Sequence, residues 1–148
     1  MAIINSYLNF DGQCEEAFNF YKSLFGGEFV NISKFSEMPP QEGMPPLSDE
    51  LKNRVMHVSL PISTEINLMG SDIIPGMHTF VEGNNISLSI NAHSREETEK
   101  LFNGLSADGN ITMPLADTFW GAYFGMWTDK FGINWMVNYD DPAKVQPH

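Results

Sequence analysis

The feature that most constrains the fold is an internal similarity between two helical segments. One constant offset superimposes both acidic and apolar positions: Glu15-Glu16 on Glu96-Glu97, Phe20-Tyr21 on Leu101-Phe102, and Leu24 on Leu105. Each segment follows a stretch with strand-like alternation and precedes further strand-like stretches. The pattern therefore predicts a duplicated β-α-β-β-β unit. The alternative is that two amphipathic helices of one domain resemble each other by chance.

Periodicity divides the first half into elements, with predicted strands at residues 3–10, 28–35, 54–60 and 65–70. The predicted helix covers residues 13–25 and ends at Gly26-Gly27, a typical C-terminal signal. Residues 1–70 form the first predicted module, which includes a proline-rich loop at residues 36–53. Loops of that length in a compact domain are often lids or binding segments.

The second half repeats the design after a linker at residues 71–83, with a second module at 84–140 and a tail at 141–148. Residues 85–91 alternate as a strand, and Ser94 with Glu97 forms a capping box that opens a helix. The stretch 117–139 is rich in aromatic residues and glycines and predicts a hairpin whose turn contains Lys130 and Gly132.

Composition limits the class of protein. A chain of 148 residues predicts a single domain, and no apolar run is long enough to cross a bilayer. The net charge of -11 argues against nucleic-acid binding and favours encounter with cations, although solubility alone also accounts for it. The single Cys14 excludes an internal disulfide, and its place at a helix start could lower its pKa. The amino-terminal residues carry no secretion signal, so we expect a cytoplasmic protein without membrane partners.

Strand alternation predicts one apolar and one polar face for the sheet. The apolar positions include Ile4, Leu8, Met56, Val58, Leu60, Ile66, Leu68, Ile86, Leu88, Ile90, Ile133, Trp135 and Val137. The opposite face carries neutral polar groups and thioethers: Asn5, Tyr7, Asn9, His57, Ser59, Asn67, Met69, Asn85, Ser87, Asn134, Met136 and Asn138. Because a solvated face usually collects charged residues, this set favours a partly enclosed ligand site. His57 is either a hydrogen-bonded semi-buried histidine or a functional base.

Three stretches carry a resemblance to a known family: YLNFDGQCEEAFNFYKSLFGGEF, VMHVSL and DTFWGAYFGMWTDKFGINWMVNY. They resemble the PhnB-like members of the vicinal oxygen chelate superfamily, which includes glyoxalase I, bleomycin resistance proteins and extradiol dioxygenases. The resemblance implies an α+β fold with two tandem β-α-β-β-β modules. Their mixed sheet would form a cup around a small-molecule site, with helices on the convex face, usually in a homodimer.

The same resemblance locates the positions where metal-dependent relatives carry His or Glu. Here they correspond to Asn5, Asn67, Asn85 and Met136, which are poor ligands for Zn²⁺, Fe²⁺ or Ni²⁺. A shift of the alignment to Glu65 still leaves too few ligands. We therefore predict no cofactor at a glyoxalase-type metal site.

Two other family associations find little support in the residues. Some relatives are described as ubiquinone-pathway methyltransferases, but the chain has no glycine-rich strand-to-helix loop of the nucleotide-binding type. Arg54 is the one basic residue expected to border the cavity. A single positive charge is too little to bind a dianionic phosphonate well.

Three functional hypotheses remain open at this point. The first is a metal-free protein that binds a small cationic or aromatic molecule, by stacking on Trp120, Tyr123 or Trp127 and by hydrogen bonds from the polar face. The second is a lyase, isomerase or dioxygenase-type enzyme that uses His57 as base, or as a metal ligand together with Glu65 or Asp72. The third is a dimer in which the aromatic residues form an interface.

Overall fold

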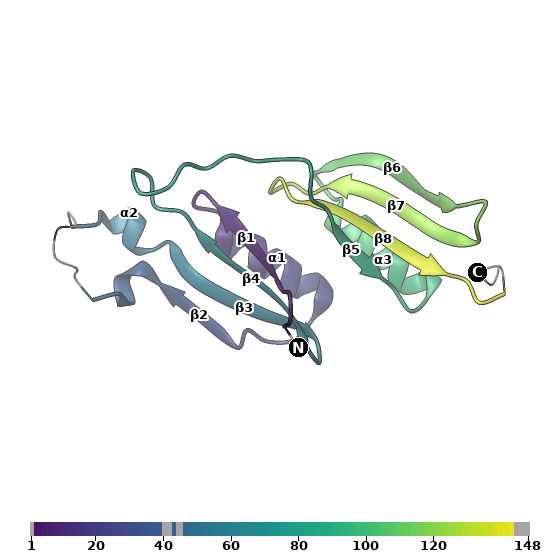
Figure 1. Cartoon of the computed structure of the whole chain (residues 1–148), viewed down its shortest axis with the longest axis horizontal. Coiled ribbons are helices and arrows are strands. Elements are labelled where there is room, and N and C mark those ends of the chain that lie inside the picture. The colour runs from purple at the N-terminus through teal and green to yellow at the C-terminus, as the bar shows by residue number, and fades with distance from the viewer. Residues whose placement is uncertain (1, 40–42, 44–45, 144–148) are drawn as a thin grey trace. The chain divides into compact units, whose positions relative to one another are not determined.

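The computed structural model describes residues 2–39, 43 and 46–143. The chain divides into two compact units, Met1–Val81 and Glu82–His148. Figure 1 shows that each unit has its own sheet and its own long helix. No helix in the described part of the chain has the length and apolar character that crossing a membrane requires.

The first unit contains one long helix and a four-stranded mixed sheet. Its main elements are β1 (Ser6–Phe10), α1 (Cys14–Phe25), β2 (Asn31–Lys34), β3 (Val55–Ser63) and β4 (Ile66–Asp72). The strand order is β1-β4-β3-β2, with β1 parallel to β4 and the other pairs antiparallel. A 3-10 turn, η1 (Phe35–Glu37), and a short helix, α2 (Asp49–Lys52), lie in the β2–β3 connection.

The second unit repeats this plan. Its elements are β5 (Leu88–Asn91), α3 (Arg95–Leu105), β6 (Asn110–Asp117), β7 (Ala122–Thr128) and β8 (Asn134–Asp140). The order β5-β8-β7-β6, with β5 parallel to β8, reproduces the topology of the first sheet. The predicted duplication of a β-α-β-β-β unit is therefore confirmed.

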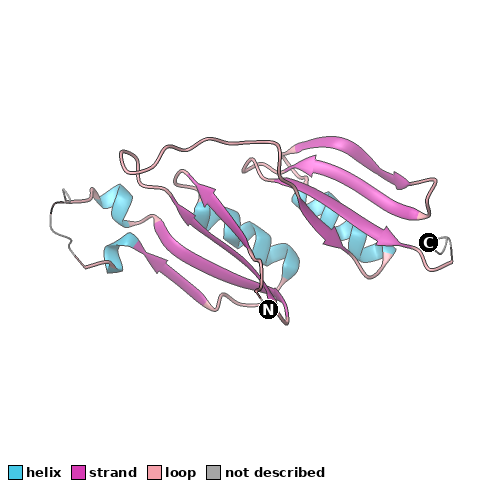
Figure 2. Cartoon of the chain, viewed as in Figure 1, coloured by secondary structure: helices cyan, strands magenta, loops and turns pink. Residues whose placement is uncertain are grey.

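In each unit the core lies between the long helix and one face of the sheet (Figure 2). Leu8, Phe10 and Leu68 are buried in the first unit, and an added Cβ at Gly70 would lie 2.7 Å from the Phe18 ring of α1. In the second unit Trp127 and Trp135 stack with ring centroids 6.4 Å apart, and Phe102 of α3 meets Trp127 edge-on. Aromatic burial of this size supplies much of the packing energy of a small module. We call the opposite side of each sheet its open face.

A buried carboxylate organises the loops of each unit. Asp72 accepts hydrogen bonds from the backbone N–H groups of Gly12 and Cys14 through Oδ1, and from Val55 through Oδ2. Asp129 accepts from the N–H groups of Phe131 and Ile133 and from the indole of Trp135. Both carboxylates satisfy donors that would otherwise be buried without a partner.

The predicted starts of three strands, at residues 3, 28 and 85, are each three residues too early. Ile4 is 95% exposed and Ile86 is 75% exposed, because β1 begins at Ser6 and β5 at Leu88. Ile66 is also exposed (57%), although it lies in β4. The loop predicted at residues 36–53 contains α2, whose first turn is capped by the Ser48 side chain.

The alternation predicted for β3 is wrong at its first residues. Ser33 pairs with His57, whereas Lys34 pairs with Val55, so Met56 is an extra residue opposite β2. Val55 is fully buried and donates its N–H to Asp72, while Met56 lines a cavity together with Asn9 and Ser71 of the open face. A β-bulge therefore exchanges the faces expected for Val55 and Met56.

Candidate functional site

The open face of the first unit carries most of the predicted site residues of that module. Strand pairing places Tyr7, Met69 and Ser59 in one row across β1, β4 and β3. Asn9 and Ser71 form the next row along the same two strands. Because these positions alternate with buried Leu8, Leu68 and Leu60, their side chains face away from α1.

Tyr7 and His57 form a side-chain pair on this face. The Tyr7 hydroxyl lies 3.1 Å from His57 Nδ1, and the two ring centroids are 5.6 Å apart. The hydrogen bond fixes the orientation of the imidazole ring, because one of its nitrogens has a partner. His57 is half-buried and Tyr7 is 44% exposed, so both rings are accessible from the open face.

The same unit contains a cavity of about 350 Å³. Three strands contribute Asn9, Met56, Ser71 and Asp72 to its lining. The β2–β3 connection contributes Phe35, Met38 and Leu47, and the segment after β4 contributes Ile73, Ile74, Met77 and His78. The lining is therefore mostly apolar, with a polar edge, which is typical of small-molecule sites of this size.

Asn9 and Ser71 determine the polarity of that edge. The Ser71 hydroxyl donates to Asn9 Oδ1 at 3.3 Å. This bond uses the oxygen of the Asn9 amide and leaves its NH₂ group as donor for a ligand. Asp72 also lines the cavity, but its two oxygens accept the three backbone N–H groups described above and it is only 4% exposed.

Arg54 joins the segments that form the cavity walls. Its Nη1 donates to Asp11 Oδ1 at 2.7 Å and to the Ile73 carbonyl at 3.0 Å, and its Nε donates to Glu50 at 3.0 Å. Burial alone would lower the pKa of the Arg54 guanidinium, but the hydrogen bonds with Asp11 and Glu50 outweigh burial and raise that pKa. The guanidinium thus holds α2 and the segment after β4 from one point. Arg54 was expected to border the cavity, and its Nε and Nη1 donors are used within the protein.

The remaining predicted polar residues are only partly brought together. The Asn67 N–H donates to Asn5 Oδ1 at 3.4 Å, so these two lie side by side before the Tyr7 row. Asn85 and Ser87 precede β5 and are not part of its open face. Asn134 holds that segment by donating to the carbonyls of Gly83 and Ile86.

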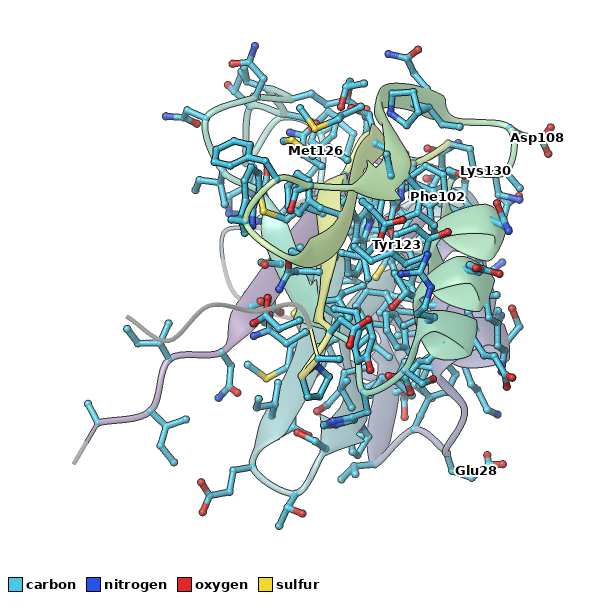
Figure 3. The ribbon with its side chains drawn as sticks, turned by 90° about the vertical axis from the view of Figure 1, so that its right-hand side faces the viewer. Glu28, Phe102, Asp108, Tyr123, Met126 and Lys130 are labelled. Atoms are coloured by element: carbon cyan, nitrogen blue, oxygen red, sulfur yellow. The ribbon has the colours of Figure 1, made fainter. Side chains whose placement is uncertain are left out.

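The open face of the second unit differs from the expectation for the aromatic hairpin. Trp127 is 1% exposed and contacts Phe102, so its predicted role in stacking on a ligand is wrong. Tyr123 lies on the same side of β7: Arg95 of α3 stacks 3.9 Å from its ring centroid, and its hydroxyl donates to Glu99. Figure 3 shows Tyr123 and Phe102 on the helix side of the sheet and Met126 on the other side.

The alternation of β7 is shifted by one residue from the prediction, so Phe124 takes the face that was expected for Tyr123. Phe124 pairs with Asn138 and Met126 pairs with Met136, so these four residues share the open face. Trp120 is 49% exposed but lies in the turn between β6 and β7, next to Phe119, and not on a strand.

The residues present do not fit a glyoxalase-type metal centre. Amide and thioether groups occupy the four positions that the resemblance implies, and within the described residues no group of three or more His, Cys, Asp or Glu could hold a metal ion. Asp72, which was suggested as a partner of His57 in a metal site, has both oxygens engaged by backbone N–H groups of Gly12, Cys14 and Val55. Glu65 is exposed in the turn before β4.

Cys14 is buried, and its pKa is raised, not lowered as the sequence suggested. Burial is the main cause, and the negative charges of Asp72 and Glu15 add to it. Such a thiol is a poor nucleophile, because the thiolate is the reactive form.

Comparison with known proteins places the chain in a family. The family profile described as 3-demethylubiquinone-9 3-methyltransferase matches residues 2–138. Protein YjdN of Escherichia coli (strain K12) is 32% identical over an alignment of 149 positions, which covers 97% of each chain. Protein PA1353 from Pseudomonas aeruginosa is 38% identical, with a TM-score of 0.82 over 95% of this chain and 98% of that one.

A more distant structure shows the same fold at low identity. The fosfomycin resistance protein FosX from Listeria monocytogenes has a TM-score of 0.64 at 9% identity, over 98% of both chains. The PhnB-like resemblance of the three sequence stretches and the paired β-α-β-β-β modules agree with these matches. The chain therefore belongs to the 3-demethylubiquinone-9 3-methyltransferase family, the PhnB-like family of the vicinal oxygen chelate superfamily.

Proposed function

We propose that this protein binds a small, largely apolar or aromatic molecule in the cavity of its first unit, without a glyoxalase-type metal centre. The observation that carries the proposal is the cavity itself, about 350 Å³ in volume, with apolar walls from two connecting segments and a polar edge from the sheet. Cavities that combine apolar walls with a few oriented polar groups are the usual form of small-molecule sites. Methyl transfer is not part of the proposal, because the chain lacks a nucleotide-binding loop.

A fluorescence titration tests this proposal. The neutral dye N-phenyl-1-naphthylamine becomes fluorescent in apolar surroundings, so we expect a saturable signal with one site per chain. Leu47→Trp and Met77→Trp each introduce a larger side chain into the cavity wall and should weaken dye binding at least tenfold.

Met126→Trp is the matched control, because Met126 lies on the open face of the second unit. It should leave dye affinity unchanged, and circular dichroism should show that all three variants are folded. Equal dye affinity in the wild-type protein and both cavity variants would contradict the proposal.

The Tyr7–His57 pair favours a second candidate, an enzyme of lyase or isomerase type in which His57 acts as a general base. The Tyr7 hydroxyl holds Nδ1 at 3.1 Å, which orients the ring so that Nε2 can act on a molecule bound at the open face. Mass spectrometry of small-molecule extracts incubated with wild-type protein or with His57→Ala tests this candidate. A product that forms only with the wild type supports it, and identical profiles contradict it.

The proposal includes a homodimer. Its support is the exposed aromatic turn between β6 and β7, where Phe119 is 97% and Trp120 is 49% exposed, since exposed apolar rings often mark contact surfaces. Sedimentation velocity should give twice the chain mass of 16.6 kDa. The mass of a single chain at micromolar concentration would contradict this part of the proposal.

A further inference from the structure

We infer that the ligand of the first unit's cavity is electrically neutral and carries a carbonyl group that accepts a hydrogen bond from Asn9. This inference rests on the proposed function and specifies the chemical class of its ligand. A neutral ligand replaces the expectation of a cationic molecule, which came from the acidic composition of the chain.

The first step concerns charge. Among the described residues of the lining, Asp72 and His78 are the titratable groups. Both Asp72 oxygens accept backbone N–H groups, from Gly12, Cys14 and Val55, so they are held within the protein and are not directed to a cation for a direct ion pair. Burying an ion without a partner is costly.

The nearest guanidinium does not compensate an anion either. The described lining contains no lysine or arginine. Arg54 lies behind the wall, where Asp11, Glu50 and the Ile73 carbonyl use its donors. An anionic ligand would therefore lose hydration beside the negative charge of Asp72, with His78 as its one possible ionic partner in the described lining. The described lining thus favours a neutral ligand.

The second step concerns the polar edge. Because Asn9 Oδ1 accepts from the Ser71 hydroxyl, the amide NH₂ of this lining residue is the group that can donate to a ligand. A carbonyl oxygen is a good acceptor for this donor, and ketones, esters and amides all carry one. The thioethers of Met38, Met56 and Met77 can adapt to the apolar remainder of the molecule, since methionine side chains are flexible and polarizable.

Four naphthalenes that share one ring system provide the test. They are 2-acetylnaphthalene (neutral carbonyl), 2-ethylnaphthalene (neutral, no acceptor), 2-naphthoate (anion) and 2-(aminomethyl)naphthalene (cation). Displacement of N-phenyl-1-naphthylamine gives their affinities at pH 7. We expect the acetyl compound to bind about two- to thirteenfold more tightly than the ethyl compound, the range that one hydrogen bond of about 0.5–1.5 kcal/mol provides. Both ions should bind at least tenfold more weakly than the acetyl compound.

The variant Asn9→Leu tests the donor. It should abolish the preference for acetyl over ethyl, and saturable binding of the ethyl compound to this variant shows that the cavity is intact. Asn91→Leu, at an exposed position in β5, is the control and should behave as the wild type.

The outcomes separate this inference from the proposed function. If the dye binds but the ions displace it as well as the acetyl compound, or if Asn9→Leu retains the acetyl preference, the inference is overturned and the binding function stands. If the dye does not bind at all, the proposed function itself fails.

Discussion

Asp72 is the residue through which the start of α1 and the start of β3 are held together. Its three hydrogen bonds join Gly12 and Cys14 to Val55, which is far from both in the sequence. Because Val55 gives its N–H to this side chain, the bond accounts for the bulge that turns Met56 toward the cavity. This buried carboxylate thus fixes the backbone that places Met56 in the cavity wall, while its own oxygens bond to backbone N–H groups.

The variant Asp72→Asn should therefore destabilise the protein. An amide removes the charge and directs an NH₂ group at backbone N–H donors, so we expect the free energy of unfolding to fall by about 3 kcal/mol. Urea denaturation measures this change. Glu28→Gln is the control, because Glu28 has an 86% exposed side chain and its change should stay within about 0.5 kcal/mol. Equal stability of both variants would refute the structural role of Asp72.

Cys14 makes a prediction about pH. Its pKa is raised in the folded protein and ordinary in the unfolded chain, about 8.5. The associated stability is therefore fully present below about pH 8.5 and falls by about 1.4 kcal/mol per pH unit as the unfolded thiol ionises above it. Unfolding free energies between pH 7 and 10 should decline more steeply for the wild type than for Cys14→Ala. Parallel curves would show that the thiol does not contribute.

At the scale of elements, the two modules differ most in the connection between their second and third strands. In the second unit, residues 118–121 join β6 to β7. In the first unit, the corresponding connection runs from η1 through α2, and it supplies Phe35, Met38 and Leu47 to the cavity. The proline-rich connection between β2 and β3 thus supplies a cavity wall in the first unit, whereas the β6–β7 turn of the second unit is too short to do so.

Arg54 is expected to hold this wall in position. Its partners Asp11 and Glu50 are 47% and 66% exposed, so Arg54→Met should lower stability by only about 1 kcal/mol. The larger effect should be local: faster hydrogen exchange at residues 47–53 and 73–78, with several-fold weaker dye binding. Arg95→Met, which removes an exposed ion pair in the second unit, should change neither. Unchanged exchange in Arg54→Met would exclude the positioning role.

The sequence predicted the elements well and the contacts between distant segments poorly. Helical periodicity located α1 and α3, and alternation placed Trp135 and Val137 in the core. Met56 was assigned to the wrong face, because its bulge depends on Asp72. Tyr123 was misplaced by one residue, since alternation alone does not determine strand register. Met38, Leu47 and Met77 belong to segments without a period, and the length of the proline-rich loop was a signal that pointed to Met38 and Leu47 only.

At the scale of the whole molecule, a duplicated fold has acquired different properties in its two halves. Both units share one topology and both use a buried aspartate to organise their loops. The first unit adds the cavity and the Tyr7–His57 pair, whereas the open face of the second presents Phe124, Met126 and Met136. If a small molecule binds in the first unit and not at the open face of the second, the difference between the two units is functional.

Methionine methyl NMR locates that molecule most directly. The nine methionines can be labelled with ¹³C at the methyl carbon and assigned through Met→Leu variants. Titration with 2-acetylnaphthalene should shift the signals of Met38, Met56 and Met77, which line the cavity, and leave those of Met126 and Met136 in place. Saturable shifts confined to Met126 and Met136, or no shift at the three cavity methionines at millimolar probe, would contradict a binding site in the first unit.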